Sequence, residues 1–377
     1  MLKYFEKHRH ATWLELFFDL VFVAAIGFVA HDLAHTHDNH LSSKQILLFP
    51  LQFIPIWWIW ATHTIYSNRF DTDSKRHRFA TLLIMLLLVI MATFLGSKIE
   101  QRYSLFVFTY VLIRFIIAGS YFNSAGKHSE KSIFTKQIGI GFAIGALICG
   151  SSIFFEAPLR YLVFYTGIIF DLTFPIFLRD KLKSIPIHLE HLVERSGLLI
   201  IILLGESVIS LVNALQGEEW DVYNAVAAMS GFIMTGAIWW VYFDSFNRLE
   251  RAKRTLTGMP ILYAHLIVCM GLIILANVIR HAILQDLDNP YFGVLAITGM
   301  VMFYLGKEIP YYILFPTYRF NLVVNTTVCI AITVFSTFLP RTEYALVGIT
   351  MGMLFYVYSN YRWVLSKDVS QYLRQEA

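Results

Sequence analysis

Apolar stretches of about 20 residues recur along the whole sequence, and no other feature constrains the fold as much. One helical crossing of a bilayer needs about 20 mostly apolar residues. Only 15% of the 377 residues are charged, whereas soluble proteins carry about 25%. The sequence therefore predicts an all-α polytopic membrane protein.

About twelve transmembrane helices are predicted, joined by connections too short to form a soluble domain. Pro50 and Pro55 interrupt the second of them, so its bounds are the hardest to set. The expected ranges are 13–34, 45–67, 78–97, 103–122, 134–154, 159–178, 192–215, 222–243, 258–281, 291–308, 320–339 and 343–362.

The distribution of lysine and arginine predicts the orientation of these helices. Segments on the side of the N-terminus, with the helix ends that flank them, hold 22 of the 30 basic residues, and the opposite loops hold six. The other two, Arg114 and Arg195, lie in or at the edge of predicted helices. Because cytoplasmic loops are enriched in Lys and Arg, both termini are predicted to be cytoplasmic.

The basic segment at 179–191 divides the chain into two halves, 1–185 and 186–377, with six predicted helices each. Tryptophans precede an Asn-Arg pair in the second helix of each half, at 57–60 and at 239–240. Six is an even number, so a repeat of this kind would give both halves the same orientation. Aromatic belts at membrane interfaces are the alternative origin of the paired tryptophans.

The first predicted helix carries two carboxylates, Glu15 and Asp19, which lie four residues apart and so share one face. A charge at the bilayer centre costs about 2.5–3.5 kcal/mol even on the more lenient insertion scale. Both side chains would avoid this cost near headgroups or water. The interpretation preferred here is that they face the interior of the bundle and meet cations there.

The seventh predicted helix carries a third acid, Glu206, twelve residues after Glu194. This spacing corresponds to about 18 Å and places Glu206 near the middle of the membrane. Ser210 and Asn213 continue its face as a polar stripe. A protonated Glu206 that only bonds a neighbouring helix is the alternative to a functional acid.

Arg114 lies near the centre of the fourth predicted helix and needs an anion or water beside it, because arginine stays protonated. Its candidate partners are Glu15, Asp19, Asp171 in the sixth helix and Glu206. A fixed ion pair and a role in gating or anion binding are both open.

Histidines offer two further hypotheses. His63 and, in the ninth helix, His265 fall inside predicted spans, where imidazole can relay protons or simply be hydrogen-bonded in the core. In the outer loop, His31 and His35 have the i, i+4 spacing of metal ligands, and His37 follows closely. These three are weak metal candidates, because no second ligand motif accompanies them.

Several classes of function are not indicated. The net charge of +4 is scattered along the chain, so nucleic acid is not a predicted partner. The three cysteines, Cys149, Cys269 and Cys329, lie in apolar runs without metal-ligand spacing. No nucleotide, dinucleotide or hydrolase motif stands in a suitable context, so no cofactor is predicted.

Three motifs carry a resemblance to a known family. They are ELFFDLVFV at 15–23, a Trp-rich helix ending in YSNRFD at 66–71, and HLVERSGLLIIILLGES at 191–207. In this order they resemble the bacterial low temperature requirement protein A family (LtrA) over nearly the whole chain. The resemblance implies a polytopic protein of the bacterial inner membrane and leaves its activity open.

A second resemblance covers only the first helix. Residues 17–22 with Ala25 are similar to the FSDxVFxxA pattern of TMEM175-type potassium channels, in which this helix lines the pore. The similarity implies that the first and seventh helices face a common axis. The sequence departs from the pattern at Phe18, in place of serine, at Trp13, in place of arginine, and at Ala24, in place of a bulky constriction residue.

The preferred function is movement of a small ion or solute through the membrane, with coupling to protons as one form of it. Glu15, Asp19 and Glu206 would lie on the path, with Arg114 as their internal counter-ion and His63 and Asp171 as secondary candidates. The expected partners are the lipid bilayer and the small solute, with a homo-oligomer left open. No enzymatic activity is predicted.

Two alternatives remain. A membrane enzyme acting on lipids would have to use the acids Asp71, Asp73 and Asp244 with Arg69 and Arg248, whose spacing matches no known motif. A stress-response protein that transports nothing would hold its buried charges in static pairs.

Overall fold

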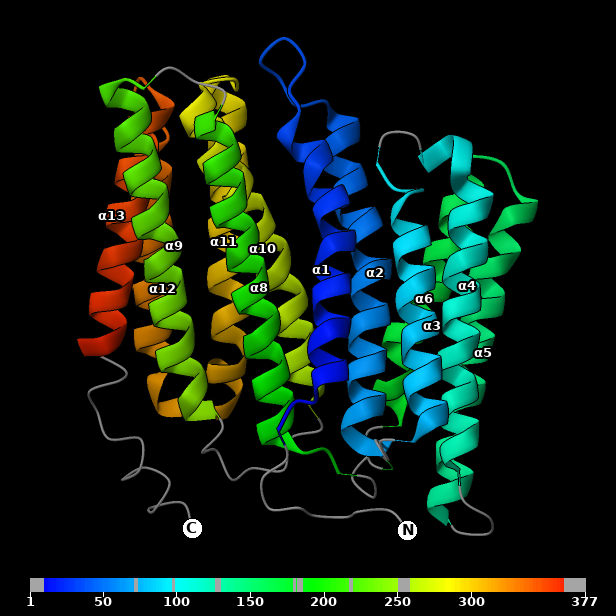
Figure 1. The fold of residues 1–377 in the computed structure, drawn as a ribbon. Helices are drawn as coiled ribbons and strands as arrows, with labels where there is room; N and C mark the ends of the chain where they lie inside the picture. Colours follow the sequence, from blue (N-terminus) through cyan, green and yellow to red (C-terminus); the bar gives the residue numbers. More distant parts are fainter. Residues whose placement is uncertain are drawn as a thin grey trace. The chain divides into compact units, whose positions relative to one another are not determined.

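A computed structural model describes residues 10–70, 74–96, 99–125, 130–178, 181, 186–216, 220–249 and 258–362. For residues 130–131 and 246–249 it describes the backbone only. Within these ranges the structure is all-helical, with twelve α-helices and no β-strand, which confirms the predicted class (Figure 1).

The helices follow the predicted ranges closely. Most extend a few residues further into polar sequence, because a hydropathy window detects the apolar crossing and not the whole helix. Their bounds are α1 Trp13–Ala34, α2 Ser43–Phe70, α3 Lys75–Ala92, α4 Ile99–Ser124, α5 Glu130–Ser151, α6 Leu159–Phe177, α8 Leu189–Gln216, α9 Val222–Leu249, α10 Met259–Leu284, α11 Asn289–Leu314, α12 Arg319–Ser336 and α13 Thr342–Asn360.

Ten helical segments among the described residues are long and apolar enough to cross a membrane. They lie on every α-helix except α3, which begins with the charged run at 75–78, and α13. This number of apolar helices makes the chain a multi-pass membrane protein.

The chain forms two compact units. Unit 1 comprises Met1–Val29 and Pro50–Arg195, and unit 2 comprises Ala30–Phe49 and Ser196–Ala377. This division falls ten residues beyond the expected midpoint at 185/186, and residues 30–49 belong to unit 2. The expected internal repeat stays a prediction. The tryptophans that suggested it differ in surroundings, since Trp57, Trp58 and Trp60 are buried whereas Trp239 and Trp240 are more than half exposed.

In unit 1, α3 packs on α4, α4 on α5, and α5 on α6. Glycines on α5 permit close contact with α6, since a Cβ on Gly141 would overlap the Phe174 ring and one on Gly145 would overlap the Asp171 carboxylate. The spacing of Gly141, Gly145 and Cys149 therefore marks a packing face, as small-residue spacing does in membrane helices.

Helix α2 runs through Pro50 and Pro55 without ending. A proline has no N–H, so Pro55 leaves the carbonyl of Leu51 without its usual helical donor. The hydroxyl of Tyr165 on α6 donates to this carbonyl instead. A partner on another helix thus makes an internal proline tolerable here.

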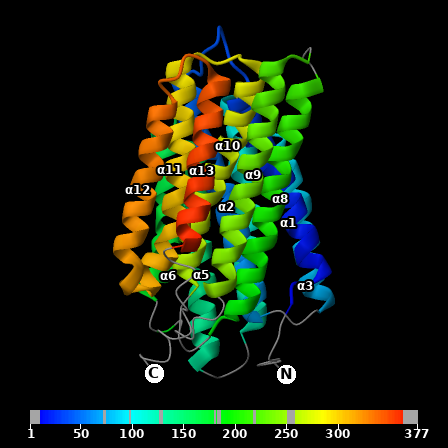
Figure 2. The ribbon, with the colours of Figure 1, turned by 90° about the vertical axis from the view of Figure 1, so that its left-hand side faces the viewer.

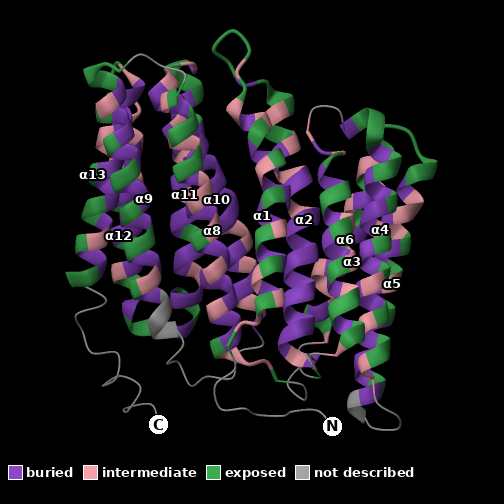
Figure 3. Ribbon diagram, viewed as in Figure 1, coloured by how far each residue is buried: buried purple, intermediate pink, exposed green. Residues whose placement is uncertain are grey.

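In unit 2, α10 is the central helix. It packs on α9, α11 and α13, and α13 packs in turn on α9 and α12 (Figures 1 and 2). Its sequence is apolar on all sides, which is typical of a helix buried all round. Figure 3 shows this contrast, with buried residues predominating on α10 and exposed residues frequent on α9.

Candidate functional site

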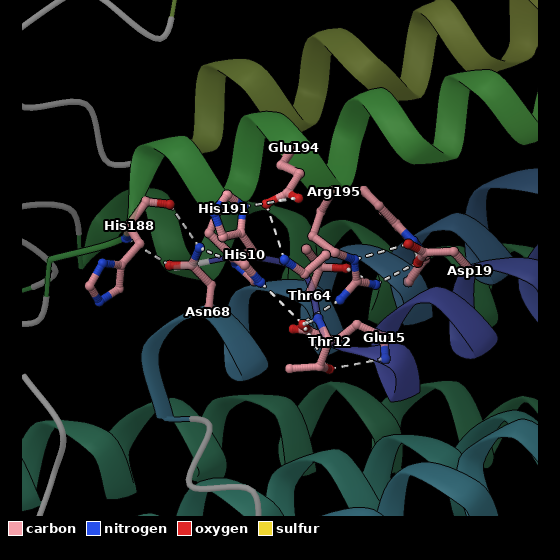
Figure 4. Close-up of polar contacts among 12 residues, drawn as sticks. His10, Thr12, Glu15, Asp19, Thr64, Asn68, His188, His191, Glu194 and Arg195 are labelled. Atoms are coloured by element: carbon pink, nitrogen blue, oxygen red, sulfur yellow. Dashed lines mark hydrogen bonds and ion pairs between the residues drawn. The ribbon is translucent and has the colours of Figure 1, made fainter. Parts of the chain in front are cut away.

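The three motifs that carry the family resemblance meet in one buried cluster of unit 1 (Figure 4). Each motif lies on a different helix and presents polar side chains at four-residue spacing, so that each set shares one helical face. The members are Glu15 and Asp19 on α1, Trp60, Thr64 and Asn68 on α2, and His191 and Arg195 on α8.

Arg195 is the centre of this cluster and contacts both carboxylates. Its Nε and Nη2 donate to the two oxygens of Asp19 at 3.0 and 2.5 Å. Its Nη1 lies 3.1 Å from Oε1 of Glu15. All three side chains are at most 1% exposed. A buried arginine fork that holds a carboxylate at two points is a strong and directional contact.

Neutral donors complete the coordination of the two acids. Trp60 Nε1 donates to Asp19 Oδ1 at 2.7 Å. The backbone N–H and the hydroxyl of Thr12 donate to Glu15 Oε2 at 2.9 and 3.1 Å. Both side chains are thus surrounded by donors, as ionised carboxylates require.

The hydrogen bonds of Asn68 determine how the His191 ring is held. The Asn68 amide accepts from the backbone N–H of His188 and donates to the carbonyl of the same residue, both at 2.9 Å, which determines which of its ends is the NH₂ group. The second proton of that NH₂ points to His191 Nδ1 at 2.9 Å. Nδ1 is therefore an acceptor, and the ring proton sits on Nε2, 3.2 Å from Glu15 Oε2.

These contacts bring the ionisable groups of the cluster together. Two carboxylates share one guanidinium among the described groups, and the imidazole of His191 lies beside Glu15. Glu194, on the rim, is 36% exposed and accepts from the backbone N–H of Ala11. Both Glu15 and Asp19 are buried, and burying a charge costs several kcal/mol unless it is compensated.

A second buried ion pair lies elsewhere in unit 1. Arg114 Nη2 is 2.5 Å from Asp171 Oδ2, and its Nη1 donates to Thr62 at 2.8 Å. The guanidinium also stacks over the Phe142 ring at 4.7 Å. Of the four acids considered for Arg114 the structure selects Asp171, whereas Glu15 and Asp19 have Arg195 as their cation.

His63 is buried beside Phe18, with the two rings stacked at 4.1 Å. Its Nε2 contacts the Thr81 hydroxyl at 3.2 Å, and its Nδ1 has no hydrogen-bond partner among the described residues. It makes no ion pair with a described carboxylate. His265 in unit 2 is a satisfied core histidine, bonded to Tyr242 and to the carbonyl of Ile261.

Glu206 belongs to unit 2 and is partly exposed. No described residue forms a hydrogen bond or ion pair with it. The predicted path shared by Asp19 and Glu206 stays a prediction.

The outer histidines form a small turn. His31 and His35 lie with their Nε2 atoms 2.7 Å apart, and burial together with the nearby His31 lowers the pKa of His35. His37 and His40 pair through their backbones across Asp38 and Asn39, which both have positive φ. No group of three or more metal-type side chains occurs among the described residues, so the metal hypothesis gains no third ligand.

The residues suggested for a lipid enzyme are only partly described. Asp71 and Asp73 lie outside the described residues, as does the Arg248 side chain. Asp244 accepts a hydrogen bond from Trp240 one helical turn before it.

Unit 2 contains an ion pair that sequence reasoning missed. Lys307, counted above with the basic helix ends, is buried on α11, 3.3 Å from Glu308 Oε1 and 3.0 Å from the Tyr356 hydroxyl. Tyr356 also donates to Glu308. The sequence signal for this pair was that the acid Glu308 directly follows Lys307 within an apolar run.

The unit 1 cluster also contains residues that were not selected from the sequence, namely Trp60, Asn68, His191 and Arg195. All four lie within the three motifs that carry the family resemblance, and this position in the motifs could have indicated them. Their pairing depends on which helices are neighbours, and hydropathy does not contain that information.

Comparison with known proteins places these motifs in context. The model of the family described as bacterial low temperature requirement A protein (LtrA) matches residues 10–358, which include every residue of the cluster. An uncharacterized protein of Rhizobium meliloti (strain 1021) is 25% identical over 320 residues, which cover 78% of this chain and 76% of the relative. The chain belongs to the bacterial low temperature requirement A protein family.

Proposed function

We propose that this protein moves a small ion or solute across the membrane in a proton-coupled cycle, and that the Glu15–Asp19–Arg195–His191 cluster is its proton-binding site. The observation that carries the proposal is a fully buried group of side chains in which two carboxylates share the guanidinium of Arg195. Ionisable groups at this depth are costly, so a functional role is the default expectation for them.

A proton fits this pair of carboxylates more readily than a metal ion does. Donor groups of the protein already occupy most lone pairs of the two carboxylates, and a cation would have to displace them. A proton needs no cavity and only one free lone pair. Asp19 Oδ2 accepts only from Arg195 Nε among the described groups, so we assign the exchangeable proton to Asp19.

Protonation of Asp19 would also change how the helices are held together. The neutral acid binds Arg195 more weakly, which leaves the guanidinium to Glu15. Because Asp19 and Glu15 are on α1 and Arg195 is on α8, the proton changes the contacts between these two helices. A ligand that binds one arrangement better than the other would thereby be linked to the proton.

Glu206 is the second acid of the proposal, as a partly exposed carboxylate on α8 without a described partner. The inner membrane is the proposed location, with both termini in the cytoplasm as the lysine and arginine distribution predicts. No chemical conversion of a substrate is part of this function.

A flux screen in proteoliposomes tests the proposal, with potassium, sodium, protons and small anions as the species offered. Asp19→Asn and Glu206→Gln should each abolish proton-coupled flux while the protein elutes and melts like a folded protein. Glu194→Gln is the matched control, because Glu194 is an acid on α8 outside the pairing with Arg195. Flux at the wild-type level in Asp19→Asn would refute the assignment.

A further inference from the structure

A polar pocket of about 220 Å³ lies in unit 1 where α2 ends, α3 begins and α4 ends. A site needs only about 10–15 Å³ of such volume to hold one water molecule, so this pocket has room for a much larger group. Its polar lining includes Tyr66, Arg76, His77, Asn123 and Ser124, and none of its described lining residues is acidic.

The lining is rich in groups that donate hydrogen bonds. Arg76 brings a guanidinium and Asn123 an amide, and both are exposed. The hydroxyls of Tyr66 and Ser124 are 2.8 Å apart. Ser74, the N-cap of α3, accepts from the backbone N–H of His77 and keeps its own hydroxyl proton. Arginine with several neutral donors is the chemistry that recognises a phosphate group.

The position of the pocket points to the origin of such a group. The ends of α2 and α4 and the start of α3 lie at one end of unit 1, where candidate spans meet the surface (Figure 1). The first turn of α3 carries three basic side chains, those of Lys75, Arg76 and Arg78. Basic pockets between transmembrane helices near the cytoplasmic surface suit the headgroups of anionic lipids.

We propose that this pocket binds a phosphate group, carried by the headgroup of an anionic phospholipid. The inference is independent of the proposed transport function, because none of the residues assigned to proton binding lines the pocket.

Gly119 offers a way to close the pocket without disturbing the fold. It lines the pocket, and a Cβ built on it would meet no atom within 4 Å. Gly119→Phe should therefore fill the space, whereas Gly119→Ala should leave it open. Arg76→Gln removes the lining charge. Arg78→Gln is its matched control, because Arg78 is an exposed arginine of the same helical turn that does not line the pocket.

The test measures binding to the delipidated full-length protein in non-ionic detergent by calorimetry. The probes are dioctanoyl phosphatidic acid, dioctanoyl phosphatidylcholine and inorganic phosphate. Phosphatidic acid should bind saturably and phosphatidylcholine at least tenfold more weakly. Arg76→Gln and Gly119→Phe should each weaken binding tenfold or more, in line with the loss of a charge-assisted bond, while Arg78→Gln and Gly119→Ala bind like wild type.

The inorganic phosphate arm separates two sources of the ligand. Weak or absent binding of phosphate beside tight binding of phosphatidic acid supports the lipid headgroup. Equal binding of both supports the phosphate site and overturns the lipid source. The phosphate site itself is overturned if no probe binds saturably, or if Arg76→Gln, folded as judged by its melting temperature, binds like wild type. It is also overturned if Arg78→Gln weakens binding as much as Arg76→Gln does.

Discussion

Removal of Arg195 should destabilise the protein far more than removal of either acid it contacts. In Arg195→Gln, Glu15 and Asp19 lose their shared cation while both stay buried. Breaking a buried ion pair by removing one partner costs about 3–5 kcal/mol. With about 2 °C per kcal/mol for a large domain, this corresponds to a melting temperature lowered by roughly 6–10 °C.

Asp19→Asn should behave in the opposite way. It leaves one carboxylate, Glu15, in contact with the Arg195 guanidinium. The amide of asparagine keeps an oxygen that accepts from Trp60 or Arg195. The melting temperature of Asp19→Asn should therefore lie at or above that of wild type. Adding Asp19→Asn to Arg195→Gln should recover part of the loss, because it removes one of the two carboxylates that contacted Arg195.

Thermal unfolding of the detergent-solubilised variants, followed by tryptophan fluorescence, checks this order. Trp60 is itself part of the cluster, so its emission reports locally as well. A melting temperature of Arg195→Gln within 2 °C of wild type, or an Asp19→Asn variant that is less stable than Arg195→Gln, would refute this account of the cluster.

Three further predictions concern other sites. Gly145→Ala should lower the free energy of unfolding by about 1–3 kcal/mol, because the new Cβ would overlap the Asp171 carboxylate that binds Arg114. Gly236→Ala is the control, because a Cβ at Gly236 would meet no atom within 4 Å. Equal melting temperatures of the two variants would contradict the contact. Lys307→Leu should lower the free energy of unfolding by about 3–5 kcal/mol, because it leaves Glu308 buried without its cation. The double variant Lys307→Leu with Glu308→Leu should recover most of this loss. A double variant no more stable than the single one would count against the pair. Burial raises the pKa of Asp286, but the hydrogen bond and charge of His281 and the charge of Arg280 outweigh it and lower the pKa overall. A carboxyl with a lowered pKa stabilises the fold above its unfolded pKa of about 4 and loses this effect as the pH falls further. Asp286→Asn should therefore lower the melting temperature of the protein at pH 7 and have little effect on it at pH 3. A melting temperature lowered equally at pH 3 would contradict this.

The helices could be predicted because their signal is local. A run of about 20 apolar residues is sufficient evidence for a crossing, and each of the twelve predicted ranges overlaps one α-helix among the described residues. The ends were less predictable. Helix α9 continues to Leu249, beyond the expected end at 243, because its last turns are polar and a hydropathy window does not register them.

The site was predictable only in part. Glu15 and Asp19 were selected because their spacing places two acids on one face of an apolar helix, and both are buried. Arg114 was named as their counter-ion, whereas in the structure they contact Arg195 and Arg114 contacts Asp171. The choice depends on helix neighbours, and α1 contacts the start of α8 through Arg195 whereas Arg114 lies beside α6.

Infrared spectroscopy of the protonated carboxyl group tests the central claim most directly, namely that Asp19 holds an exchangeable proton in the Arg195 cluster. Membranes containing wild-type protein should show a protonated-carboxyl band that disappears as the pH is raised. Glu194→Gln should keep this band, and Asp19→Asn should lack it. An identical, pH-dependent band in Asp19→Asn and wild type would contradict the account.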